Sequence, residues 1–132
     1  MRILTIYCDG GCFNNQDANK RFGYGSFIIL ENNTMIESNQ FEYGRITNNE
    51  AEYFALTSAL DHVISMKKED EEISLIIKTD SQLVEGHLMK GWKTNQRMWT
   101  LVMGVKHKLN TNFKSWKIEH ISGTDMKKIL GH

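Results

Sequence analysis

Runs of apolar and β-branched residues predict strands in the first third of the chain. Residues 2–8 form an apolar, β-branched run that is typical of a strand. Residues 23–31 and 34–43 form two more runs of this kind, and the Asn-Asn pair at 32–33 suits a two-residue hairpin turn. We therefore expect the second and third strands to pair antiparallel.

Further along the chain, the apolar spacing alternates between helical and strand-like. Residues 48–66 carry an apolar stripe at helical spacing, and residues 73–79 follow as a fourth strand. Because a helix links it to the earlier strands, we expect this strand to run parallel to the first. Residues 81–89 and 96–109 are predicted helices, and the alternation over 116–122 predicts a fifth strand. The stripe of the first helix consists of Ala55, Leu56, Ala59, Leu60 and Val63.

The order of these elements predicts an α/β fold. Three consecutive strands favour an antiparallel meander, and the later strands are expected to join it in parallel. The result is a mixed five-stranded sheet flanked by helices. A length of 132 residues suits one domain, which we assign to residues 1–132.

Composition and charge narrow the class of protein. With 40% hydrophobic and 24% charged residues, the chain can bury a core and is not a disordered tail. No apolar run reaches the ~18 residues of a membrane span, and the N-terminus lacks the apolar region of a signal peptide. Cys8 and Cys12 are too few for a disulfide framework and are expected to be free thiols. These features predict a cytoplasmic protein.

The charges are unevenly distributed along the chain. The formal net charge is zero, which argues against a protein that coats nucleic acid without specificity. Residues 90–117, however, contain seven Lys or Arg residues and no Asp or Glu, so this stretch is the candidate nucleic-acid face. Its basic residues are Lys90, Lys93, Arg97, Lys106, Lys108, Lys114 and Lys117.

Two aspartates each follow an apolar strand. If the first and fourth strands are adjacent and parallel, Asp9 and Asp80 lie at the same sheet edge, where open α/β sheets bind their ligands. Each also has a purely structural interpretation. Asp9 could be a turn residue, since we expect a tight turn at Asp9-Gly10-Gly11, and Asp80 could cap the helix that starts at Ser81.

Helix geometry selects a third carboxylate. Thr47 and Glu50 form the pattern of a capping box, which gives Glu50 a structural role. Glu52 lies about 200° further around the helix, aligned with the sheet-facing Leu56. A buried glutamate is unfavourable without a partner, and a metal shared with the two aspartates would be one. We therefore prefer Glu52 to Glu50 as a ligand.

Together these residues resemble the motifs of the ribonuclease H family. The segments Asp9-Gly10-Gly11, Thr47–Glu52 and Thr79-Asp80-Ser81 match that family, type 1 in particular, in order and spacing. The predicted elements follow the same order, and the resemblance covers residues 2 to about 123. It implies an endonuclease that hydrolyses the RNA strand of RNA–DNA hybrids and leaves 5′-phosphate and 3′-hydroxyl ends.

The resemblance also implies roles for individual residues. Asp9, Glu52 and Asp80 would hold two Mg²⁺ ions, for which Mn²⁺ can substitute. Trp99 is favoured as a core residue, whereas Trp92 stands beside Gly91 in a basic loop. Contacts to the RNA strand are implied for Gly10, Gly11, Asn48 and Asn49, and contacts to the DNA strand for Trp92, Lys93 and Thr94.

The C-terminal segment departs from the family pattern. The family has a fourth carboxylate after the fifth strand, and Asp125 is the only acidic residue available there. Either Asp125 substitutes, as a fourth catalytic ligand, or the usual position is missing. The second alternative would leave the domain without its usual C-terminal helix. Thr124 or His132 could stand in for a histidine that assists product release in the family.

Two other functions compete with the nuclease. An incomplete fourth carboxylate would fit a non-catalytic or weakly active module that only binds RNA–DNA hybrids. A junction resolvase on the same fold is a third possibility, but the Thr47-Asn48-Asn49 segment fits reading of 2′-hydroxyls instead. The expected partner is an RNA–DNA hybrid. We expect the protein to be a monomer and not to bind membranes.

Overall fold

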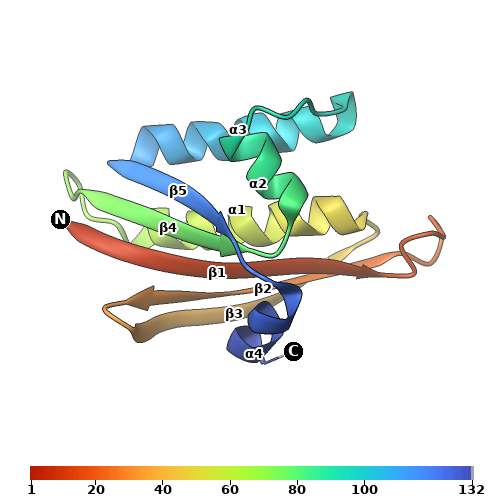
Figure 1. Cartoon of the computed structure of the whole chain (residues 1–132), viewed down its shortest axis with the longest axis horizontal. Coiled ribbons are helices and arrows are strands. Elements are labelled where there is room, and N and C mark those ends of the chain that lie inside the picture. Colours follow the sequence, from red (N-terminus) through yellow and green to blue (C-terminus); the bar gives the residue numbers. More distant parts are fainter. Residues whose placement is uncertain (132) are drawn as a thin grey trace.

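A computed structural model describes residues 1–131, which form a mixed sheet with helices on both faces (Figure 1). The strand order is β3-β2-β1-β4-β5. The strands are β1 (Arg2–Phe13), β2 (Phe22–Glu31), β3 (Thr34–Gly44), β4 (Ile73–Thr79) and β5 (Ser115–His120). The helices are α1 (Asn48–Met66), α2 (Gln82–Met89), α3 (Gln96–Asn112) and α4 (Gly123–Leu130). The predicted fold class is confirmed.

Strand directions agree with the sequence analysis. β1 pairs antiparallel with β2, β2 pairs antiparallel with β3, and β4 runs parallel to both β1 and β5. Asn32 and Asn33 form the turn between β2 and β3 and have φ angles of 52° and 64°. Positive φ at both central residues is the requirement of a type I′ hairpin turn, and asparagine tolerates it better than most residues.

The first strand is longer than predicted. The expected turn at Asp9-Gly10-Gly11 is wrong, because β1 continues to Phe13 and keeps its ladder with β2 throughout. Asp9 lies opposite Ser26, and Gly11 lies opposite Tyr24. The two glycines therefore mark places where other parts of the molecule approach the strand closely, a known use of glycine inside a strand.

A helix also follows the last strand, contrary to the alternative that the chain lacks one. The Ser122 hydroxyl caps α4 by accepting a hydrogen bond from the Asp125 amide, and Gly131 ends the helix with a φ of 75°. Serine at the start and glycine at the end are ordinary helix boundaries. α4 lies on the sheet face opposite α1, α2 and α3 (Figure 1).

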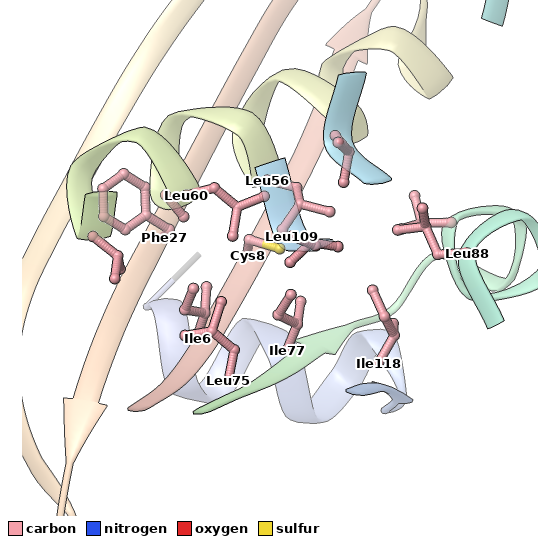
Figure 2. Close-up of a cluster of buried hydrophobic side chains, with 14 of the residues drawn as sticks. Ile6, Cys8, Phe27, Leu56, Leu60, Leu75, Ile77, Leu88, Leu109 and Ile118 are labelled. Carbon is pink, nitrogen blue, oxygen red and sulfur yellow. The ribbon is translucent and has the colours of Figure 1, made fainter. Parts of the chain in front are cut away.

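The core lies between the sheet and α1, with α2 and α3 closing its side (Figure 2). Alternate side chains of β1 and β4 point into it, as a strand with one buried face requires. Figure 2 labels Ile6, Cys8, Phe27, Leu56, Leu60, Leu75, Ile77, Leu88, Leu109 and Ile118. No helix within residues 1–131 has both the length and the apolar character needed to cross a lipid bilayer.

Candidate active site

Two central strands bring Asp9 and Asp80 together. The parallel register of β1 and β4 pairs Arg2 with Ile73 and Tyr7 with Lys78. Two further steps along the same register place Asp9 beside Asp80, just past the end of β4. Ser81, not Asp80, caps α2, so the structural interpretations of both aspartates, as turn and as cap, are wrong.

The start of α1 adds the third carboxylate. Thr47 and Glu50 form the predicted capping box, with both of its hydrogen bonds present. Glu52 is only 9% exposed, and its Oε2 accepts a hydrogen bond from the Gly10 amide at 3.3 Å. The structure therefore confirms that Glu52, and not Glu50, lies on the buried side of the helix.

Asp9, Glu52 and Asp80 form one compact group of carboxylates. One oxygen from each lies within 4.8 Å of the others. Oδ1 of Asp80 is buried and has no hydrogen-bond partner among the described atoms. A divalent cation would satisfy that oxygen, and three carboxylates are the hard ligands that Mg²⁺ prefers. The residues present therefore fit a metal centre.

The close approach of these carboxylates changes their pKa values. Burial and the neighbouring Asp80 raise the pKa of Asp9 to about 7. Burial, together with the charges of Asp9 and Asp80, raises the pKa of Glu52 to about 9. Both groups therefore favour protonation more than free carboxyl groups do, since three negative charges so close together repel each other in a partly dry site. A cation would reverse this preference.

Gly10 and Gly11 allow other elements to approach the strand. A Cβ atom on Gly10 would lie 2.2 Å from the Ala51 carbonyl oxygen of α1, and one on Gly11 would lie 2.3 Å from the Tyr24 hydroxyl. Both contacts are shorter than real Cβ atoms show. Gly10 therefore lets the first turn of α1 rest on β1, which sets the position of Glu52 relative to Asp9.

We expect Gly10→Ala to destabilise the protein by about 3 kcal/mol, because α1 must move away from β1 to make room. Urea denaturation would measure the loss. The matched control is Gly104→Ala in the middle of α3, where nothing lies within 4 Å of the added Cβ. That change should stabilise the protein by ~0.5–1 kcal/mol, and equal effects at the two positions would contradict this account.

Asp125 does not join the carboxylate group found among the described residues. It is exposed in the first turn of α4. The start of this helix nevertheless lies close to the site, because a Cβ on Gly123 would be 3.5 Å from Asp80 Oδ2. Lys127 lies on the same helix, and its charge acts to lower the pKa of Asp9. His132 lies outside the described residues.

The two asparagines at the start of α1 border a polar pocket of about 360 Å³. Asn48 donates its backbone amide to Asn15 Oδ1 at 2.9 Å. Two of the lining residues are arginines and four are asparagines. The lining consists of Asn15, Arg21, Thr47, Asn48, Asn49, Asn95, Arg97 and Met98.

Several of these pocket residues belong to none of the motifs in the sequence. Asn95 could have been noticed as a helix cap, since its side chain accepts from the Met98 amide. Asn15 and Arg21 lie in the loop between β1 and β2 and carry no local pattern. They reach the pocket only through the tertiary fold.

The tryptophans give one expected and one unexpected result. Trp92 is 46% exposed and rests on Gly86, where a Cβ would lie 2.0 Å from its ring. The Lys90 ammonium lies 5.7 Å from the Trp92 ring centroid. Lys93 and Thr94 continue from it in an irregular segment before α3. The core role expected for Trp99 is wrong, because this residue on α3 is 57% exposed.

The sheet order and the placement of the helices are those of the ribonuclease H fold. The crystal structure of RNase H1 from the halophilic archaeon Halobacterium salinarum NRC-1 superposes with a TM-score of 0.81 at 25% identity, covering 95% of this chain and 89% of that one. LC11-RNase H1 in complex with an RNA/DNA hybrid gives 0.85 at 19% identity, covering 95% of this chain and 89% of that one. The second likeness concerns the fold alone.

Sequence comparison gives the family. The RNase H family matches residues 1–132, and the chain belongs to this family. A ribonuclease HI of Halobacterium salinarum is 38% identical over 78 residues, which is 59% of this chain and 37% of that protein. The chain thus spans little more than a third of the length of this relative.

Proposed function

We propose that this protein is a metal-dependent endonuclease that hydrolyses the RNA strand of RNA–DNA hybrids. The observation that carries the proposal is the group formed by Asp9, Glu52 and Asp80, whose oxygens lie within 4.8 Å of one another. Membership of the RNase H family supports it. The structure of LC11-RNase H1 was determined with an RNA/DNA hybrid, which supports the choice of substrate.

Asp9, Glu52 and Asp80 would hold the metal, for which we propose two Mg²⁺ ions, with Mn²⁺ able to substitute. Such ions supply, when bound, a lower pKa for the attacking water and stabilisation of charge on the phosphate oxygens. The expected products carry 5′-phosphate and 3′-hydroxyl ends. We further propose Asp125 as a candidate fourth ligand, supported by its place on the helix that starts beside Asp80.

The chain itself positions the carboxylates before substrate arrives. The β1–β4 register fixes the two aspartates relative to each other. The capping box fixes the first turn of α1, and the Gly10 amide holds Glu52 by a hydrogen bond. A rigid set of ligands needs little reorganisation during the reaction, which is the usual source of catalytic advantage in such sites.

We assign recognition of the hybrid to the surface beside the carboxylates of Asp9, Glu52 and Asp80. Asn48 and Asn49 can exchange hydrogen bonds with 2′-hydroxyls, which distinguish RNA from DNA. Gly10 lies against Ala51 of the same helix turn, and we assign Gly10 and Gly11 to the RNA strand as well. Arg21, which also lines the polar pocket, suits phosphate oxygens. We assign Trp92, Lys93 and Thr94 to the DNA strand, because an exposed aromatic ring beside lysines can contact a sugar–phosphate backbone.

We expect Asn49→Ala to reduce the preference for a hybrid over a DNA duplex by about tenfold, as a lost buried polar contact costs ~1–3 kcal/mol. Fluorescence anisotropy with the hybrid and with the DNA duplex, both in EDTA, would measure the ratio of the two affinities. Asn110→Ala, on the distant end of α3, is the control and should leave it unchanged. Equal weakening for both ligands would mean that Asn49 does not read the RNA strand.

The proposed activity is tested by a panel of labelled substrates with Mg²⁺. The hybrid should be cut, while single-stranded RNA, double-stranded RNA and double-stranded DNA of the same sequence should not. The ends are then identified by whether a kinase can label the products before or only after phosphatase treatment. Cleavage of all RNA substrates alike would indicate a different nuclease.

One observation favours a second candidate, a module that binds hybrids without cutting them. Asp125 is absent from the carboxylate group of the described residues, so a second metal would have fewer protein ligands. Calorimetric titration with Mn²⁺ separates the two functions, since two sites are expected for the nuclease and a single weak site for the module.

We also propose that the protein works in the cytoplasm as a monomer. Cys8 and Cys12 are both free thiols, and burial raises the pKa of Cys8 well above its usual value, which keeps this thiol unreactive. Free thiols suit a reducing compartment.

A further inference from the structure

An ion pair joins the beginnings of two helices beside the polar pocket. The Arg97 guanidinium in the first turn of α3 donates to Glu50 Oε1 at 3.0 Å. The same oxygen accepts the Thr47 amide at 2.9 Å, which is one of the two bonds of the capping box. Arg97 thus holds the carboxylate that closes the first turn of α1.

The environment of Glu50 favours a defined geometry. Its side chain is only 13% exposed, although that of Arg97 is 62% exposed. Donors from two separate elements hold this carboxylate, the Thr47 amide before α1 and the Arg97 guanidinium of α3.

The residues next to Glu50 carry the proposed recognition of RNA. Asn48 and Asn49 precede it in the same turn, and the Asn48 amide is held from its other side by Asn15. A rotation or opening of this turn would displace both asparagines. The ion pair between Arg97 and Glu50 opposes that motion, because Arg97 belongs to α3, which packs on α1 and extends beyond the pocket.

We infer that Arg97 is a positioning residue, which acts through Glu50 to hold Asn48 and Asn49 in the orientation that selects the RNA strand. The inference rests on the proposed function. Arg97 also lines the polar pocket, and a direct contact between its guanidinium and a phosphate is the competing explanation. The two explanations predict different effects of replacing Arg97 in a protein whose Glu50 has already been replaced. A positioning role predicts no further loss of preference for the hybrid, whereas a phosphate contact predicts a further loss.

A double-mutant cycle tests this difference. Glu50→Gln keeps an oxygen for the Thr47 amide but removes the charge that Arg97 binds, and Arg97→Gln removes the guanidinium. Affinities for an RNA–DNA hybrid and for a DNA duplex of the same sequence are measured by fluorescence anisotropy in EDTA, so that no cleavage occurs. The ratio of the two affinities is the readout, together with its dependence on salt.

Each single variant should lower the preference for the hybrid about threefold, as expected for an ion pair of this exposure. The double variant should lose no more than either single one, and the salt slope should stay that of the wild type. Arg97→Lys should restore part of the preference. A full additional loss in the double variant, or a salt slope reduced by about one, would overturn the inference in favour of a phosphate contact.

A second ion pair between the same helices gives the control. Lys108 Nζ lies 2.6 Å from Asp61 Oδ1, at the other end of the α1–α3 contact. Asp61→Asn, which breaks this pair and leaves every basic residue of 90–117 in place, should not change the preference for the hybrid. An equal loss there would show a general effect of helix packing and overturn the inference.

Amide hydrogen exchange separates failure of this inference from failure of the proposed function. Arg97→Gln should speed exchange at residues 48–51 about threefold, whatever the protein binds. If the wild type shows no preference for hybrids, the proposed function fails. If exchange at these amides is unchanged in the variant, the positioning role fails.

Discussion

Replacing Asp80 with asparagine is expected to reduce cleavage of the RNA strand by at least about a thousandfold, while binding of the hybrid stays within about threefold. Asp80 contributes a buried oxygen that no group within residues 1–131 satisfies, and an amide offers a metal no negative charge. The proposed contacts to nucleic acid come from other residues, so affinity should be retained. Single-turnover cleavage and anisotropy measure the two effects separately.

The control for this variant is Asp61→Asn, which removes one carboxylate from the exposed side of α1. It should cleave at the rate of the wild type. Retained cleavage in the Asp80 variant would refute the assignment of this residue to the metal, even if the protein is a nuclease. Loss of binding as well would indicate that the variant disturbs the fold of the site.

Replacing Glu52 with glutamine should stabilise the metal-free protein at alkaline pH by a few kcal/mol. The folded pKa of Glu52, about 9, is above its ordinary value of 4.5, and that of Asp9, about 7, is above 3.8. When folding raises the pKa of a group, the folded state binds more protons than the unfolded state at any pH between the unfolded and the folded pKa of that group. Stability is therefore fully present below about pH 4 and lost progressively as the pH rises to about 9.

Urea denaturation in EDTA at pH 5, 7 and 9 measures this slope. The wild type should lose stability across the series, whereas Glu52→Gln should lose much less, because glutamine has no proton to give up. Glu69→Gln, in the exposed loop before β4, should follow the wild type. Parallel curves for all three proteins would contradict the assigned electrostatics of the site.

Adding Mg²⁺ should reverse the effect of pH on the wild type. A bound cation favours the ionised carboxylates, so the rise in melting temperature should be larger at pH 9 than at pH 5. The Glu52 variant should respond less at both values. This experiment needs no substrate and therefore tests the metal centre independently of the nuclease activity.

Much of the fold followed from hydrophobic periodicity, and the reasons are physical. The strands at the centre of the sheet are continuous apolar runs, and α1 has an apolar stripe long enough to be unambiguous. The placement of Asp9 beside Asp80 followed from parallel strands, and the choice of Glu52 followed from the angle between positions on a helix. These inferences needed only local geometry and one assumption about topology.

The features that could not be predicted depend on contacts between distant segments. The glycines after Asp9 resemble a turn, but they lie inside β1 because α1 and Tyr24 need their space. Trp99 is apolar and at helical spacing, yet α3 turns it outward. Arg97 meets Glu50 only because α3 packs alongside α1 with the two helix starts together, which no local pattern indicates. The boundaries of α4, by contrast, coincide with local signals in the sequence, Ser122 at its start and Gly131 at its end.

The most direct test of the central claim is cleavage of end-labelled RNA in an RNA–DNA hybrid by the wild-type chain, with Mg²⁺, with Mn²⁺ and with EDTA. A nuclease centred on Asp9, Glu52 and Asp80 predicts cutting with either metal and none with EDTA. Cutting that persists in EDTA would contradict a metal centre. A folded protein that binds the hybrid but does not cut it with either metal would contradict the proposed activity and favour the binding module.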